Sequence, residues 1–181
     1  MSTQQELTIY ESPLGPLTLR AGAAGLTGLY FPGGEFSAGE DRSTASPLLR
    51  QACEQLDEYF AGERQRFELE LDLPGTEFQL SVWQALRAIP YGATISYSTL
   101  ATRLGRLDRL RAAAAAVGRT PVPIVVPCHR VIGADGSLTG YGGGLDRKAA
   151  LLDLERRGVR GEPPEPTWAF RQLALALPAD G

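Results

Sequence analysis

The hydrophobic periodicity of the chain changes at Pro74-Gly75, and this change restricts the fold more than any other feature of the sequence. Before this dipeptide, segments such as RFELELDLPG alternate apolar and polar residues, which is the pattern of a half-buried β-strand. After it, apolar residues recur every three or four positions, as on one face of an α-helix. The sequence therefore predicts an α+β protein with a small N-terminal antiparallel-sheet subdomain, a mostly helical domain and a C-terminal tail, over residues 1–74, 75–160 and 161–181.

The N-terminal subdomain is expected to contain short antiparallel strands and one amphipathic helix. The first strands lie in apolar segments separated by the turn sequences SPLGP and GAAG, and the alternating segment 66–73 predicts a further strand. Ser46-Pro47 is a favourable helix start. The helix after it ends near Gly62 and carries an apolar stripe of Leu49, Cys53, Leu56 and Phe60. Because free cysteine is usually buried, Cys53 is interpreted as a core residue.

The second half of the chain has the signals of several helices. Thr76 and Gln79 have the spacing of a capping box, and the helix that follows has an apolar stripe beside which Trp83 is interpreted as core. Two short helices over about 96–104 and 108–117, separated by a glycine turn, predict a helix-turn-helix. A last helix is expected from about 145 to 157, closed by a glycine.

Charge is distributed unevenly along the chain. The net charge is −3, but residues 101–119 contain five arginines and only one acid, which gives this segment a local charge of +4. A solvated helix face and a nucleic-acid contact both explain such a cluster. The arginines are Arg103, Arg106, Arg109, Arg111 and Arg119.

Composition excludes several classes of protein. Apolar residues make up 43% of the chain, without an uninterrupted stretch long enough to cross a membrane. The polar start MSTQQEL lacks the features of a secretory signal, so a cytoplasmic protein is expected, or a nuclear one in a eukaryote. Two cysteines and one histidine are too few for a disulfide framework or a typical structural zinc site. No metal and no cofactor are expected.

The sequence PVPIVVPCHRVIGADG places Cys128 next to His129, the single histidine. Adjacent side chains point in different directions on a strand or a helix, so activation of the thiol by His129 requires a bridging water. A cationic histidine needs an orienting acceptor, for which Glu155, Asp153 and Asp146 all have suitable positions. The alternative is a structural cysteine beside a surface histidine.

Four segments together resemble the O6-alkylguanine-DNA alkyltransferase family. They are SPLGPLTLRAGAAGL, GTEFQLSVWQAL, IPYGATISYSTLA and PVPIVVPCHRVIGADGSLTGYGGGLDRKAALLDLE. The resemblance runs from Ser12 to Glu155 and is most specific in PCHRV. It implies a ribonuclease-H-like N-terminal subdomain followed by a winged helix-turn-helix-like domain that lies, unusually, in the minor groove of DNA.

The resemblance also implies a reaction. Such a protein flips a nucleotide out of duplex DNA and transfers an alkyl group from O6 of guanine, or O4 of thymine, irreversibly to its own cysteine. Cys128 matches the acceptor, His129 the water-linked base, and Glu155 the carboxylate that orients it. Tyr141 matches the hydroxyl donor to guanine N3. The implied partner is double-stranded DNA containing alkylated guanine, bound by a monomer.

Further roles follow from the same alignment of motifs. Arg111 matches the residue that fills the gap left by the flipped base, and Tyr97 the one that crowds the 3′ phosphate. The other implied DNA-binding positions are Ala112, Ala115, Arg109 and Thr120, and the implied substrate-pocket positions are Gly142, Gly143 and Val131. Arg130 is interpreted as a structural ion-pair former, and Lys148 either as another or as a pocket residue.

This chain departs from the family pattern in three places. Thr120 replaces an asparagine that ties the DNA-binding turn to the active-site segment, and a hydroxyl supplies only part of that hydrogen-bonding set. Arg109 and Leu110 replace small residues, which adds a possible phosphate contact and adds bulk. Gly142 replaces a serine of some relatives, which predicts a pocket with room for longer alkyl groups.

Three other functions are alternatives to alkyl transfer. A non-catalytic lesion-binding relative would lack the cysteine that this chain has at position 128. A helix-turn-helix regulator would need polar base-reading side chains, whereas the second helix has the run Ala112 to Ala116. A cysteine hydrolase would turn over many substrate molecules.

Overall fold

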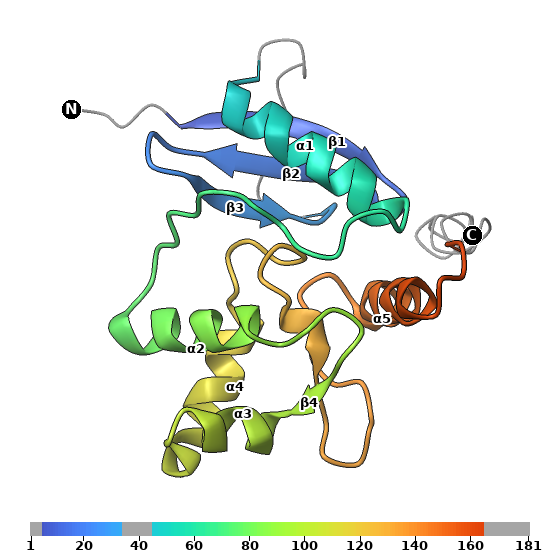
Figure 1. Cartoon of the computed structure of the whole chain (residues 1–181). Helices are drawn as coiled ribbons and strands as arrows, with labels where there is room; N and C mark the ends of the chain where they lie inside the picture. Colours follow the sequence, from blue (N-terminus) through green and yellow to red (C-terminus); the bar gives the residue numbers. More distant parts are fainter. Residues whose placement is uncertain (1–4, 34–44, 165–181) are drawn as a thin grey trace, which may run out of the picture.

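A computed structural model describes residues 5–33 and 45–164 of the chain. Figure 1 shows two lobes, with a three-stranded sheet and helix α1 in one and helices α2, α3 and α4 in the other. Helix α5 lies at the side of the second lobe, near the end of α1. The predicted α+β architecture, a small antiparallel sheet followed by a mostly helical region, is confirmed. The predicted tail, residues 161–181, lies mostly outside the described residues.

The N-terminal lobe is an antiparallel sheet covered by one helix. Strands β1 (Glu6–Ser12), β2 (Gly15–Ala21) and β3 (Leu26–Tyr30) are hydrogen-bonded in the order β1-β2-β3. Helix α1 (Pro47–Phe60) starts where the sequence predicts, because the Ser46 side chain accepts a hydrogen bond from the backbone of Leu49. Its apolar stripe is buried with the sheet, and the interpretation of Cys53 as core is confirmed by its 2% exposure.

The predicted strand over 66–73 is wrong as an element, although its buried face was predicted correctly. Only one isolated bridge forms there, between Leu71 and Leu26, with hydrogen bonds from Leu26 N–H to the Glu70 carbonyl and from Asp72 N–H to the Leu26 carbonyl. Alternation requires only an extended backbone with one side against the core, whereas a strand also requires a paired neighbour. The apolar residues of this segment contact the core: Phe67, Leu69, Leu71 and Leu73.

The second lobe contains the remaining helices and a small parallel sheet. Helices α2 (Glu77–Arg87), α3 (Tyr97–Arg103), α4 (Leu110–Gly118) and α5 (Leu145–Val159) surround strands β4 (Ile95–Ser96) and β5 (Val131–Ile132). Helix α4 begins two residues later than expected because 107–109 form a 3₁₀ turn. Helix α5 passes through Gly158 and ends instead before Gly161, whose positive φ of 69° suits glycine.

Packing between α2 and α4 joins the helix-turn-helix to the active-site segment. Trp83 is 1% exposed, as expected of a core residue, and its indole N–H donates to the Ala116 carbonyl over 2.8 Å. Cys128 belongs to the same buried cluster. The second helix of the helix-turn-helix is thus held against the chain that carries the cysteine. Among the described residues, no helix combines the length and apolar character needed to cross a membrane.

The capping box that starts α2 gives a stability prediction. The Thr76 hydroxyl accepts from the backbone of Gln79, and the Gln79 side chain accepts from the backbone of Thr76. Thr76→Ala should lower the free energy of unfolding by about 1 kcal/mol, because it removes this cap. Urea denaturation measures the change. The matched control is Ser81→Ala, which removes an exposed hydroxyl inside the same helix and should change stability by less than about 0.5 kcal/mol; equal losses in both variants would contradict the capping role.

Candidate active site

The cysteine is presented by a tightly folded segment between α4 and β5. Ile124 has a φ of 74°, which is strained for a β-branched residue and costs on the order of 1–3 kcal/mol. Its side chain is 1% exposed and packs in the core of the N-terminal lobe, which stabilises the strained turn. Leu29 of β3 donates its N–H to the Pro121 carbonyl at 2.9 Å. The segment is therefore anchored to both lobes.

Cys128 lies at the start of a 3₁₀ turn, Cys128–Arg130, and is 5% exposed. Burial raises the pKa of the thiol from 9.0 to about 11, although hydrogen bonding with Thr120 and the nearby Lys148 ammonium act in the opposite direction. The Thr120 hydroxyl donates to the Val117 carbonyl at 2.8 Å. A hydroxyl has one proton, so it can serve this carbonyl or the sulfur, but not both at once. This limit is the one expected from threonine at position 120.

His129 is fully buried, and its Nε2 lies 2.7 Å from Glu155 Oε1. The structure thus brings His129 to Glu155, whereas Asp153 pairs with Arg157 on the outer side of α5. A deprotonated carboxylate only accepts hydrogen bonds, so Nε2 carries a proton and a neutral ring has Nδ1 as an acceptor. Nδ1 is buried and has no hydrogen-bond partner among the described residues. The alternative of a surface histidine is wrong.

Glu155 is the centre of a buried hydrogen-bond network. Arg130 donates to both carboxylate oxygens, at 2.9 and 2.8 Å, and also to the Ile89 carbonyl at 2.7 Å. Tyr59 of α1 donates to Oε1 at 2.8 Å, and the Gly92 N–H donates to Oε2 at 3.3 Å. The predicted ion-pair role of Arg130 is confirmed. Tyr59 was missed, because only the fold brings it across 96 residues of sequence to this site.

The pKa of Glu155 reflects two opposing effects. Burial alone would raise it, but the charge and hydrogen bonds of His129 and Arg130 outweigh burial and lower the pKa from 4.5 to about 2. The carboxylate therefore stays ionised at neutral pH. With Nε2 held by this carboxylate, Nδ1 is the ring nitrogen of His129 that is left to accept a proton.

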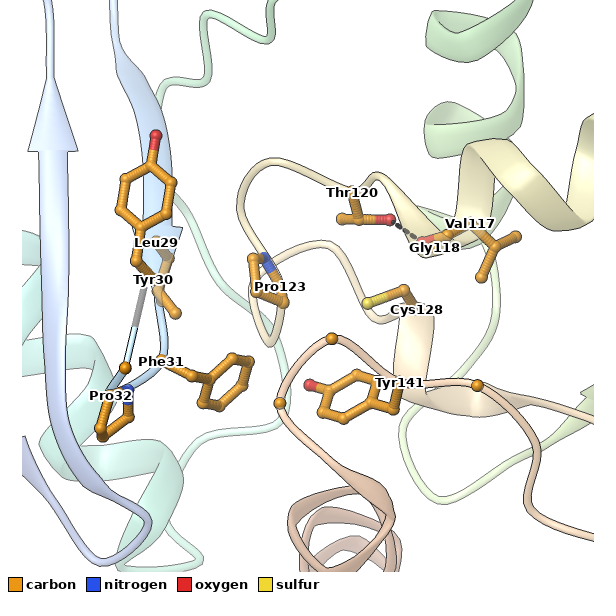
Figure 2. Close-up of a pocket in the computed structure, with 14 residues that line it drawn as sticks. Leu29, Tyr30, Phe31, Pro32, Val117, Gly118, Thr120, Pro123, Cys128 and Tyr141 are labelled. Atoms are coloured by element: carbon orange, nitrogen blue, oxygen red, sulfur yellow. Dashed lines mark hydrogen bonds between the residues drawn. The ribbon is translucent and has the colours of Figure 1, made fainter. Parts of the chain in front are cut away.

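Cys128 opens onto a pocket of about 320 Å³ between the two lobes, which is within the range of small-molecule sites. Figure 2 shows the cysteine on one side of this pocket, with Tyr141 below it and Phe31 of the N-terminal lobe opposite. The Tyr141 hydroxyl is buried and has no hydrogen-bond partner in the part of the chain that the structure describes. Burial, followed by the nearby Cys128 and Glu155, raises its pKa well above the usual 10.0. It remains a protonated donor at neutral pH.

Two of the three predicted substrate-pocket positions lie at the pocket, and the third does not. Gly142 and Gly143 line the pocket, and a side chain at position 142 would extend into open space. Val131 does not line it, because its side chain is buried in the core of the second lobe. The Val131 carbonyl accepts from Lys148 Nζ at 2.7 Å, and the Thr139 carbonyl accepts from the same nitrogen at 2.9 Å. Lys148 therefore ties two backbone segments together rather than forming an ion pair.

The second helix of the helix-turn-helix has an inner and an outer face. Ala113 and Ala116 are buried, whereas Arg111 and Ala115 are exposed and Ala112 is half-buried between them. The exposed side chains at its N-terminal end are Leu110 and Arg111, and the outer face beyond them carries short side chains.

Two predicted DNA-binding residues make contacts within the protein. Arg109 places its guanidinium 3.9 Å from the centre of the Phe78 ring, a cation–π contact. The Tyr97 hydroxyl donates to the Thr139 carbonyl at 3.3 Å, so Tyr97 lies beside the loop that leads to Tyr141. Arg106, in the same arginine-rich segment, pairs with Asp108.

Comparison with known proteins explains why a helix-turn-helix packs beside a buried cysteine, histidine and glutamate. Family models for 6-O-methylguanine DNA methyltransferase match both lobes: the ribonuclease-like domain matches residues 7–73 and the DNA-binding domain residues 77–157. The chain belongs to the 6-O-methylguanine DNA methyltransferase family.

Individual relatives agree with this assignment. The chain is 49% identical to the methylated-DNA–protein-cysteine methyltransferase of Mycobacterium tuberculosis over 147 residues, which cover 81% of this chain and 89% of the relative. It is 44% identical to that of Methanosarcina barkeri over 154 residues, covering 84% and 98%. The crystal structure of Mycobacterium tuberculosis OGT in complex with DNA has a TM-score of 0.79 and 44% identity, covering 91% of this chain and 99% of that one.

Replacement of Glu155 tests the buried network. Glu155→Gln should lower the free energy of unfolding by about 3–5 kcal/mol at pH 7, because it leaves Arg130 buried without its counter-ion. The carboxylate stabilises the fold fully above its ordinary pKa of 4.5, and this contribution is lost as the pH falls towards about 2. The difference between wild type and variant, measured by urea denaturation, should therefore decrease below pH 4.5.

The matched control for this variant is Asp153→Asn on the same helix. Asp153 forms a partly exposed ion pair with Arg157, and exposed pairs contribute about 1 kcal/mol or less. A loss as large as that of Glu155→Gln in this control, or a Glu155→Gln effect that is independent of pH, would contradict the central role of Glu155.

Proposed function

We propose that this protein repairs DNA by transferring an alkyl group from O6 of guanine, and also from O4 of thymine, to Cys128. The observation that carries the proposal is the buried Cys128 at a pocket, directly followed by His129 paired to Glu155. Family membership supports the same reaction, since relatives with this chemistry cover most of the chain. The reaction requires neither a metal nor a cofactor, and a monomer suffices for it.

The transfer is a direct displacement at carbon. The Cys128 sulfur attacks the alkyl carbon, an S–C bond forms as the C–O bond breaks, and the electron pair of that bond moves onto the guanine ring. With a thiol pKa of about 11, only about one sulfur in ten thousand is ionised at neutral pH, so loss of the proton must be coupled to catalysis. We assign His129 Nδ1 as the acceptor of this proton, through one bridging water, with Glu155 stabilising the cation.

The departing guanine also needs stabilisation, because its anion is a poor leaving group. The Tyr141 hydroxyl, buried and without an internal partner, is suited to donate to guanine N3. Gly142 and Gly143 line the same pocket, and their backbone N–H groups are assigned to further donation. The product is a thioether for which the pocket holds no evident regenerating group, so each molecule repairs one lesion.

Access to the alkyl carbon requires the nucleotide to leave the duplex. Unstacking costs a few kcal/mol, which Arg111 offsets by entering the space that the base leaves. The short side chains of Ala112 and Ala115 allow the outer face of α4 to approach the minor groove closely. Tyr97 is assigned to the 3′ phosphate and Arg109 to a backbone phosphate, with Thr120 linking the recognition helix to the cysteine segment.

Two alternatives are less well supported by these residues. A protein that binds the lesion without alkyl transfer needs no nucleophile at the pocket, whereas this pocket contains Cys128. A cysteine hydrolase forms a thioester on its cysteine and needs water to reach and hydrolyse it. An alkylated cysteine is a thioether, which water does not hydrolyse. Multiple turnovers would distinguish a hydrolase from a single-use acceptor.

Mass analysis after exposure to damaged DNA tests the transfer itself. The protein is incubated with duplex containing O6-methylguanine, digested and mapped by mass. The peptide with Cys128 should gain one methylene, in an amount that does not exceed one per protein molecule. Cys128→Ala should abolish the gain, and the matched control Cys53→Ala should preserve it because Cys53 lies in the core of the N-terminal lobe. An unmodified Cys128 with intact DNA damage would contradict the proposal.

Arg111 provides a separate test of base flipping. Arg111→Ala should slow repair of duplex DNA by about tenfold or more, since 1.4 kcal/mol of lost stabilisation is a factor of ten. Transfer from the free base O6-benzylguanine needs no flipping and should be almost unchanged. Rates come from the appearance of modified Cys128 over time. Equal losses on both substrates would exclude Arg111 from the flipping step.

A further inference from the structure

We propose that Arg147 of α5 is a specificity-determining residue: it fixes the wall of the pocket beside the N-terminal lobe and so limits the size of the alkyl group that Cys128 accepts. The inference rests on the proposed function and adds to it a residue that is not itself among those that line the pocket. The wall consists of Phe31, Pro32 and a segment that we call the glycine loop, residues 140–143.

The pocket has two different ends. Val117 and Thr120, where the helix-turn-helix ends, line one of them, and Phe31 and Pro32 line the other, with Cys128 between the two ends (Figure 2). Under the proposed function, a flipped nucleotide stays linked through its sugar, at N9, to the DNA on the helix-turn-helix. In guanine, O6 lies on the edge of the base away from the sugar. The atoms of a longer alkyl group therefore extend towards the N-terminal lobe.

The glycine loop is in direct contact with the Phe31 ring. A Cβ atom added to Gly143 would lie 2.8 to 2.9 Å from three carbons of the ring, closer than real contacts allow. This end of the pocket therefore gains room only if the loop or the ring moves. Three of the four residues of the loop are glycine, so its backbone has few conformational restraints of its own. The position of the loop is determined by its contacts.

Arg147 holds both parts of this wall against the sheet. Its Nη1 donates to the Gly143 carbonyl and its Nε to the Leu14 carbonyl between β1 and β2, both at 2.9 Å. Its guanidinium carbon lies 5.6 Å from the centre of the Phe31 ring, within cation–π distance. Hydrogen bonds from a charged, planar guanidinium are strong and have fixed directions. One side chain thus fixes the loop and the ring relative to the N-terminal lobe.

The chain just before the glycine loop is held by other residues. The Thr139 carbonyl accepts from Lys148 Nζ at 2.9 Å and from the Tyr97 hydroxyl at 3.3 Å. These bonds are independent of Arg147, which binds the last residue of the loop, Gly143. Loss of the Arg147 donors should therefore release the end of the loop and leave its start in place.

The experiment compares two alkyl groups in the same DNA. Arg147→Met removes every donor of the side chain but keeps an unbranched apolar stem. The rate of Cys128 modification is measured with two duplexes that differ only in the group on guanine O6, which is methyl in one and benzyl in the other. The ratio of the benzyl rate to the methyl rate should rise about tenfold in Arg147→Met, within the range by which a pocket discriminates substrates of different size.

The matched control is Arg156→Met on the same helix. The Arg156 side chain is 60% exposed, so this variant should leave the ratio unchanged. The ratio cancels effects that are common to both duplexes, such as partial unfolding or weaker DNA binding. Arg147→Gln keeps one donor group and provides a second, milder variant, whose ratio should lie between those of wild type and Arg147→Met.

The second readout does not depend on alkyl transfer. Hydrogen–deuterium exchange, followed by mass, reports the opening of backbone N–H groups in a peptide that covers the glycine loop. Exchange in this peptide should be about tenfold faster in Arg147→Met than in wild type or Arg156→Met. Exchange in a peptide from α2, which Arg147 does not hold, should be the same in all three proteins.

The outcomes separate this inference from the proposed function. A wild type that modifies Cys128, together with an unchanged or lowered ratio in Arg147→Met, would overturn the role in specificity and leave alkyl transfer standing. Unchanged exchange of the glycine loop in a folded Arg147→Met protein would overturn the anchoring role. A wild type that leaves Cys128 unmodified by both duplexes would overturn alkyl transfer and specificity together, and the exchange would still decide whether Arg147 anchors the loop.

Discussion

The buried carboxylate of Glu155 is the interaction on which the rest of this structure depends. It receives hydrogen bonds from Arg130, from Tyr59 and from the backbone at Gly92, and it lies against His129. These partners come from α1, from the loop after α2 and from the turn that carries Cys128. One ionised group thus joins the N-terminal lobe to the second lobe and holds the ring of His129 in place. The same two carboxylate oxygens of Glu155 hold the lobes together and contact His129, so few substitutions at this position satisfy both requirements.

The pocket depends in the same way on both lobes. Tyr141 and Cys128, the proposed donor and the proposed alkyl acceptor, belong to the second lobe, but the wall beside Tyr141 is Phe31, which directly follows β3. The backbone hydrogen bond from Leu29 to Pro121 and the side chain of Arg147 join that wall to the reactive segment. The N-terminal lobe is therefore part of the site and not only a support for it.

Local signals in the sequence predict local structure well here. The capping box at Thr76, the helix start at Ser46-Pro47 and the burial of Cys53 follow from neighbours within a few residues, and the structure confirms each of them. The segment 66–73 is different, because the alternation of apolar and polar residues indicates which side chains are buried but not whether the segment pairs with another strand. The partners at the site also cannot be found from local signals. Spacing alone allows Asp146, Asp153 and Glu155, and only the packing of α5 brings Glu155 to His129.

Residues that act across the lobes could not be found from the sequence. Tyr59 reads as one more apolar position of α1, and Phe31 as the end of a strand followed by a turn. Each acquires its contact through a separation of about a hundred residues, which no periodicity encodes. The family resemblance assigns the residues within its motifs, and the contacts of Tyr59 and Phe31 come from the structure alone.

The burial of Cys128 has a consequence for the lifetime of the protein. A thiol with a pKa near 11 is almost entirely protonated, and a protonated sulfur reacts slowly with peroxide, disulfides or stray electrophiles. An acceptor that is used once and cannot be regenerated gains from such inertness, since every accidental oxidation would waste a molecule. Under the proposed function, the closed surroundings of the sulfur therefore protect it from side reactions until a damaged base enters the pocket.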